Sequence, residues 1–135
     1  MIGYELSISL YKNIDFFGLQ LNDITELKNF KLEQLSLNYC KITDINFIDF
    51  TQMKYFLVNN SELSDISRLK EAPLEFLDLA GCGIKDISPL QNKDIITLNI
   101  NGSGISNLEI LIKMKNLETL IVNITISVFL CHLFL

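Results

Sequence analysis

The apolar residues of this chain recur in a pattern with a period of about 21 residues. The segment from Leu74 to Leu90, LEFLDLAGCGIKDISPL, is a clear copy: its first half alternates apolar and other residues, and its second half spaces the apolar residues by three. Alternation is typical of a strand, and spacing by three is typical of a tight helical turn. One copy therefore predicts a strand and then a short 3₁₀ or irregular segment that returns the chain to the next, parallel strand.

Six copies of this pattern follow one another along the chain. They start at Ile14, Leu32, Met53, Leu74, Ile95 and Leu117, at intervals of 18, 21, 21, 21 and 22 residues. The first copy is shortened and the last one fades, with Ser127 in a place that is apolar in the four central copies. One copy has too few apolar side chains to offset the entropy of ordering its backbone, so the copies must stack and share a core.

The copies resemble the leucine-rich repeat family, whose pattern is Leu-x-x-Leu-x-Leu-x-x-Asn/Cys-x-Leu. The short period and the second half, Ile/Leu-x-Asp/Asn-Ile/Leu-x-x-Leu/Ile, are most similar to the bacterial internalin type. The resemblance covers Ile14 to about Leu135. It implies an α/β repeat solenoid, a right-handed superhelix with a parallel sheet on its concave side and short 3₁₀ or coil segments on its convex side. It also implies a role in binding proteins.

Two terminal segments flank the regular copies. Residues 1–13 are expected to form a capping strand, since Leu6, Ile8 and Leu10 alternate with polar residues within Tyr4–Tyr11, and residues 14–135 form the repeat domain. Nothing polar follows the last copy, although terminal copies need a polar outer face. Two interpretations stay open: ITISVFLCHLFL is a hydrophobic strand that covers the core, or the chain is a truncated piece of a longer repeat protein.

A small polar residue or cysteine recurs at the ninth place of the copies. The residues are Asn22, Cys40, Ser61, Cys82, Ser103 and Thr125. The resemblance implies that this side chain lies buried at the bend after the strand and hydrogen-bonds the backbone there. Cys40 and Cys82 are two copies apart, which places their backbones about 9–10 Å apart, beyond the roughly 7 Å limit for a disulfide. We therefore expect a structural role for both thiols and no metal site between them.

Acidic residues and an asparagine recur at the thirteenth place, and a lone histidine lies near the end of the chain. The thirteenth-place residues are Glu26, Asp44, Asp65, Asp86 and Asn107. Each precedes a helical turn, so capping explains them better than a calcium ladder or acid–base catalysis. His132 has no serine–acid or activated-cysteine partner in a recognisable arrangement. We expect no catalytic site, no metal and no cofactor.

The charge and the termini limit the kinds of partner and location. Eleven Lys and Arg against sixteen Asp and Glu give a net charge of −5, which argues against nucleic acid. The stretch from Leu117 to Leu135 alternates with a period of two, which favours a strand over a membrane-spanning helix. The N-terminus lacks the basic region of a secretory signal, so we expect a cytoplasmic protein. The oligomeric state is left open.

The outward face of the predicted sheet is the candidate binding site. It consists of the third, fifth and seventh residues of each copy, with the eighth at its rim, and Asp78 is its only charged residue. The predicted contact residues are Phe16, Gln34, Tyr39, Tyr55, Leu57, Phe76, Asp78 and Asn99. Aromatic side chains with little charge are typical of the centre of protein interfaces. This pattern predicts a non-enzymatic module that binds a protein through its concave face.

Two alternatives are weighed against this function. Exposed strands favour aromatic residues in any case, and the asparagines at the seventh place fit a side-chain ladder. The repeats could also be a truncated, structural or regulatory segment of a larger receptor, effector or adhesin-like protein.

Overall fold

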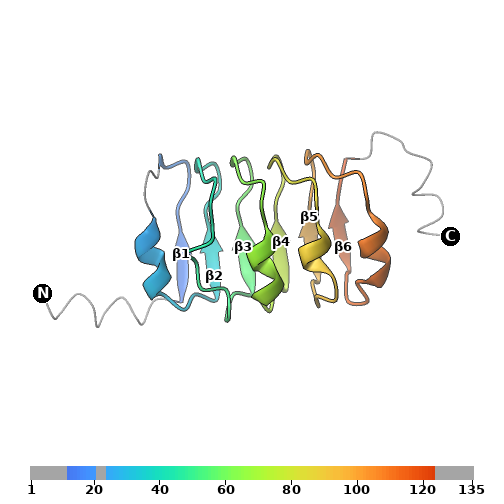
Figure 1. Ribbon diagram of the computed structural model, residues 1–135, viewed down its shortest axis with the longest axis horizontal. Coiled ribbons are helices and arrows are strands. Elements are labelled where there is room, and N and C mark those ends of the chain that lie inside the picture. The colour runs from blue at the N-terminus through green and yellow to red at the C-terminus, as the bar shows by residue number, and fades with distance from the viewer. Residues whose placement is uncertain (1–11, 21–23, 124–135) are drawn as a thin grey trace, which may run out of the picture.

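The computed structural model describes residues 12–20 and 24–123. Within these ranges the chain forms one stack of strands and short helical turns, drawn in Figure 1. The predicted capping strand at Tyr4–Tyr11 and the segment ITISVFLCHLFL lie outside the described residues.

Six short parallel strands form one open sheet in the order of the sequence. The strands are β1 (Asn13–Asp15), β2 (Gln34–Ser36), β3 (Tyr55–Leu57), β4 (Phe76–Asp78), β5 (Thr97–Asn99) and β6 (Thr119–Ile121). The register repeats without a slip, since Gln34, Tyr55, Phe76 and Thr97 are direct neighbours across the sheet. Each strand is short because the pattern alternates only over the first half of a copy.

The return segments cover the opposite side of the sheet. They contain the 3₁₀ helices η1 (Thr25–Asn29), η2 (Ser67–Glu71), η3 (Ser88–Leu90) and η4 (Glu109–Lys113), while turns alone connect β2 to β3. Figure 1 shows η2 and η3 in front of the sheet, with η1 at one end of the row and η4 at the other. The predicted α/β repeat solenoid, with a parallel sheet on one side and short 3₁₀ segments on the other, is confirmed.

The core lies between the sheet and the return segments. The middle residues of the four central strands, Leu35, Phe56, Leu77 and Leu98, have no exposed surface. The apolar places of the second half are buried as well, so the side chains of all central copies form one continuous cluster. This continuity is what allows copies that are individually too small to fold to stabilise one another.

The first copy is in a different register from the predicted one. Asn13, Ile14 and Asp15 pair with Gln34, Leu35 and Ser36, so the copy begins three residues earlier than expected. Ile14 therefore takes the fourth place rather than the first. The prediction failed because Ile14, Phe16, Phe17 and Leu19 are all apolar, and their pattern fits both registers.

The capping role of the thirteenth place is confirmed for three aspartates and one asparagine. Asp44, Asp65 and Asp86 each accept a hydrogen bond of 2.8 Å from the backbone N–H two residues later, and Asn107 does so at 2.9 Å. In the last three cases the donor is the first residue of the following 3₁₀ helix. The prediction for Glu26 is wrong, because the register shift puts Glu26 inside η1 rather than before it.

The ninth-place cysteines have the structural role expected of them. The Cys82 thiol donates to the Val58 carbonyl at 3.1 Å, and the Cys40 thiol to the Phe16 carbonyl at 3.5 Å. Ser103 does the same within its own bend, where its hydroxyl donates to the Ile100 carbonyl at 2.6 Å. Both cysteines are buried free thiols.

Candidate protein-interaction face

The third, fifth, seventh and eighth residues of each copy form one continuous surface, here called the outer sheet face. Strand pairing makes Gln34 on β2, Tyr55 on β3 and Phe76 on β4 direct neighbours across the sheet. Leu57, Asp78 and Asn99 form a second row on β3, β4 and β5. Together with Tyr39 at the rim, seven of the eight predicted residues therefore lie on this surface.

Phe16 is the exception, and the prediction for it is wrong. Because the first copy begins three residues early, Phe16 corresponds to Leu37 and packs against the core. Its place on the outer sheet face is taken by Phe17, which is 68% exposed. The phenyl ring of Phe17 lies against Tyr39, with ring centroids 5.1 Å apart and the planes tilted by 52°.

The aromatic part of the outer sheet face runs from its first copy to its fourth, and Ile121 adds an exposed apolar side chain in the sixth copy. Tyr39 and Tyr55 are 54% and 40% exposed, and Leu57 and Phe76 are half-buried between neighbouring strands. Tyr55, Leu57 and Phe76 project from strands whose middle residues are fully buried, so a packed core supports them. Large side chains held in this way lose little conformational entropy when a partner covers them.

Asp78 and Asn99 have partners within the protein. Asp78 is buried, and its carboxylate accepts hydrogen bonds of 3.0 Å from the backbone N–H of Ala80 and from the side-chain amide of Asn59. Asn99 accepts the N–H of Asn101 in the same way, at 3.1 Å. These side chains satisfy the backbone where the strands end, so they are less available to a partner than the aromatic residues.

The asparagines at the seventh place connect neighbouring copies. Leu57 has no side-chain acceptor, and the N–H of Asn59 is instead bound by the Oδ1 atom of Asn38 from the preceding copy, at 3.1 Å. The amide of Asn59 then donates to Asp78 in the following copy. Among the described residues these bonds run from a side chain to the backbone and from Asn59 to Asp78, and Ala80 interrupts the column, so they do not form a ladder of asparagine side chains. Such a ladder would also leave the aromatic residues unexplained.

The rim has a backbone conformation that most residues avoid. The described eighth-place residues Gly18, Tyr39, Asn60, Gly81 and Gly102 have φ angles of 65°, 59°, 52°, 66° and 67°. Glycine and asparagine adopt this left-handed conformation at low cost, whereas a bulky side chain is strained there. Tyr39 is the exception in the column. The column also marks Gly18 as an eighth-place residue, which is the sequence signal that could have identified Phe17.

Charged residues lie along the margins of the outer sheet face. At the starts of the strands, Lys12 pairs with Glu33 at 2.6 Å and Lys54 with Glu75 at 3.4 Å, so charges alternate from copy to copy. Across the described positions of the face itself, the charged residues are Asp15 and Asp78, both acidic.

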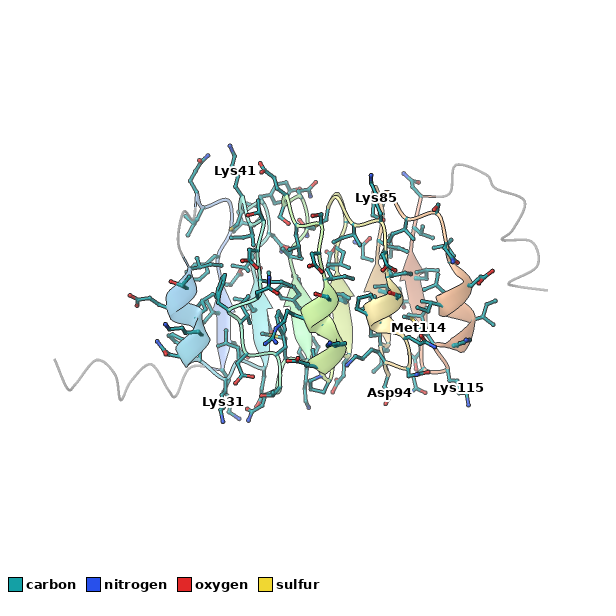
Figure 2. All side chains as sticks on the ribbon, viewed as in Figure 1. Lys31, Lys41, Lys85, Asp94, Met114 and Lys115 are labelled. Carbon is teal, nitrogen blue, oxygen red and sulfur yellow. The ribbon has the colours of Figure 1, made fainter. Side chains whose placement is uncertain are left out.

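Other charged side chains project from the two long edges of the solenoid. Figure 2 shows Lys31, Asp94 and Lys115 at the edge where the strands begin, and Lys41 and Lys85 at the edge where they end. The labelled lysines therefore project beyond the ends of the strands rather than from the outer sheet face.

One cleft lies on the helix side, between η3 and η4. Its volume is about 240 Å³, and Lys85, Asp86, Glu109 and Lys113 line it together with uncharged residues of η3 and η4. In the described part of the chain, no group of three or more His, Cys, Asp or Glu residues is placed to hold a metal ion. Among the same residues, no helix is both long and apolar enough to cross a membrane.

The comparisons with known proteins place the fold. The structure is similar to that of an internalin (inlF) from Listeria monocytogenes, with a TM-score of 0.79 and 28% identity, over 88% of this chain and 36% of that one. Internalin C2 from the same organism matches with a TM-score of 0.72 and 16% identity, over 85% of this chain and 62% of that one. No protein-family model and no curated protein matches the chain. The chain spans less than two thirds of the length of either structure.

Proposed function

We propose that this chain, a leucine-rich repeat protein with the fold of the internalins, is a non-enzymatic module that binds a protein partner through its outer sheet face. The observation that carries this proposal is the row of aromatic and apolar side chains from Phe17 through Tyr39 and Tyr55 to Phe76. The described positions of this surface carry no cation, and a continuous buried core lies beneath it.

The chemistry of this surface supports binding rather than catalysis. Aromatic residues at the centre of a low-charge patch are the usual source of interface affinity, and the charged margins would form the polar rim around it. The two buried thiols are engaged with backbone carbonyls. Asp78, the buried carboxylate of the face, is occupied by two hydrogen bonds within the protein.

A cross-linking experiment tests the location of the binding site. A partner would first be captured from a native lysate and identified, and p-benzoylphenylalanine would then be placed at Leu57 on the outer sheet face or at Ile112 on η4. Ile112 is a matched control, because it is an apolar residue that is 65% exposed on the opposite side of the solenoid. The proposal predicts cross-links from position 57 and none from position 112. The reverse pattern would favour a structural repeat segment that is contacted on its helix side.

A further inference from the structure

Three exposed residues at the start of the sheet form a group that we call the aromatic corner: Asp15, Phe17 and Tyr39. Asp15 ends β1, and Phe17 follows it two residues later, so both side chains point to the same face. Tyr39 belongs to the neighbouring copy, and its ring contacts that of Phe17. A carboxylate and two aromatic rings in tilted contact therefore lie on the same face, at one end of the outer sheet face.

The backbone at Tyr39 indicates that the ring serves a purpose other than stability. Its φ angle of 59° is that of the glycines and the asparagine in the same column. Either of those residues would make the bend with less strain, and the Tyr39 side chain is more than half exposed, so burial does not offset the strain. Strained residues of this kind cluster at ligand-binding positions.

The charge around the aromatic corner specifies the partner's chemistry. Asp15 is exposed, and within the described residues no cation forms an ion pair with it, since Lys12 pairs with Glu33 instead. The faces of aromatic rings attract cations, and a planar guanidinium can stack on a ring while it donates two hydrogen bonds to a carboxylate. The cation nearest in sequence after Tyr39 is Lys41, which Figure 2 shows at the edge where the strands end, and no ion pair joins it to Asp15 in the described residues.

We propose that the aromatic corner binds an arginine side chain of the protein partner, with the guanidinium stacked against Phe17 and Tyr39 and paired with Asp15. This inference rests on the proposed function, because it identifies one contact within the same interface. The partner segment would carry an arginine next to apolar residues, and the apolar residues would extend along the face toward Tyr55 and Phe76.

The test uses the full chain and a displayed library of random twelve-residue peptides. Peptides selected on the wild-type protein are expected to share an arginine next to apolar residues. Replacing that arginine by citrulline, which keeps the shape and removes the charge, should weaken binding at least tenfold. The same replacement should change binding less than threefold on the Asp15→Asn variant, because the carboxylate that the guanidinium pairs with is then gone.

Two variants control for charge and for folding. Glu26→Gln removes one negative charge from η1, at the same end of the solenoid but on the helix side, and should leave peptide affinity unchanged. Tyr39→Asn introduces the residue that the next copy has in this place, so it should fold normally while it weakens binding tenfold or more.

The outcomes separate this inference from the proposed function. Peptides that lack arginine, or that bind equally well with citrulline, contradict the arginine contact. If such peptides still lose affinity in Tyr55→Ala and Phe76→Ala, the proposed function stands and only the contact at the aromatic corner is wrong. Peptides that none of these variants affects contradict both.

Discussion

A Cβ atom added to Gly81 would lie 2.5 Å from the Oδ1 atom of Asn60, the residue in the same place of the preceding copy. Gly81 is also in the left-handed conformation, with φ at 66°. The left-handed conformation is strained for alanine, and the added Cβ would also displace the end of the Asn60 side chain, so Gly81→Ala should lower the free energy of unfolding by about 1–3 kcal/mol. Urea denaturation followed by circular dichroism measures the change.

Gly83 supplies the matched control for this prediction. It lies two residues further along the same bend, and an added Cβ would come no closer than 3.8 Å to the atoms around it. Gly83→Ala should therefore leave the urea midpoint nearly unchanged. Equal losses in the two variants would show that the rim conformation does not limit the scaffold.

The hydrogen bond from the Cys82 thiol to the Val58 carbonyl predicts a graded response to substitution. Cys82→Ala removes the donor from a buried bend, which should cost about 1–3 kcal/mol of unfolding free energy. Cys82→Ser keeps a donor of the type found at Ser61 and Ser103, so it should cost clearly less. A Cys82→Ala variant as stable as the wild type would mean that the thiol only fills space.

Tyr39 allows backbone strain to be separated from ring packing. Tyr39→Asn loses the contact with Phe17 but relieves the strain at φ 59°, so its stability should stay within about 1 kcal/mol of the wild type. Tyr39→Val places a β-branched side chain in the same conformation and should be clearly less stable than Tyr39→Asn. Thermal unfolding of the two variants compares them directly. A more stable valine variant would contradict the strain argued for this position.

The capping aspartates predict how stability depends on pH. Hydrogen bonds from the backbone N–H groups of Ser67 and Ser88 lower the pKa of Asp65 and of Asp86 in the folded protein. A lowered folded pKa means that each carboxylate stabilises the fold above its unfolded pKa, about 4. This stabilisation is lost as the pH falls through the folded pKa.

The wild type should therefore lose stability between pH 5 and pH 2, both given as approximate limits of this window. The double variant Asp65→Asn and Asp86→Asn should lose less over the same range, because asparagine can accept the same bonds without titrating, as Asn107 does. Urea midpoints at several pH values measure both proteins. Parallel pH profiles would contradict this role of the two carboxylates.

The period of the apolar pattern was enough to predict the parallel sheet, the core and the capping role of Asp44, Asp65, Asp86 and Asn107. Each apolar place recurs in every central copy, so an ambiguous place in one copy can be assigned from the same place in its neighbours. The first copy has a neighbour on only one side and apolar residues in both registers. Its register depends on the left-handed conformation at Gly18, which the pattern alone does not reveal.

The details of the outer sheet face were less predictable for a different reason. Asp78 was expected to contact a partner, yet its hydrogen bonds depend on Asn59 and Ala80. The N–H of Asn59 in turn uses Asn38, because Leu57 lacks an acceptor. Which hydrogen bonds form between copies depends on the particular residues that become neighbours. These bonds can be identified only once the copies are stacked.

The central claim is that a protein partner binds the aromatic residues of the outer sheet face, and the affinity of an identified partner for alanine variants tests it most directly. Tyr55→Ala and Phe76→Ala should each weaken binding by about 1–4 kcal/mol, or roughly 5- to 900-fold, without lowering the melting temperature appreciably. Ile112→Ala, on the opposite side, should bind like the wild type. If the two aromatic variants bind normally while substitutions at Arg68 or Lys85 abolish binding, the partner uses the helix side and the claim is wrong.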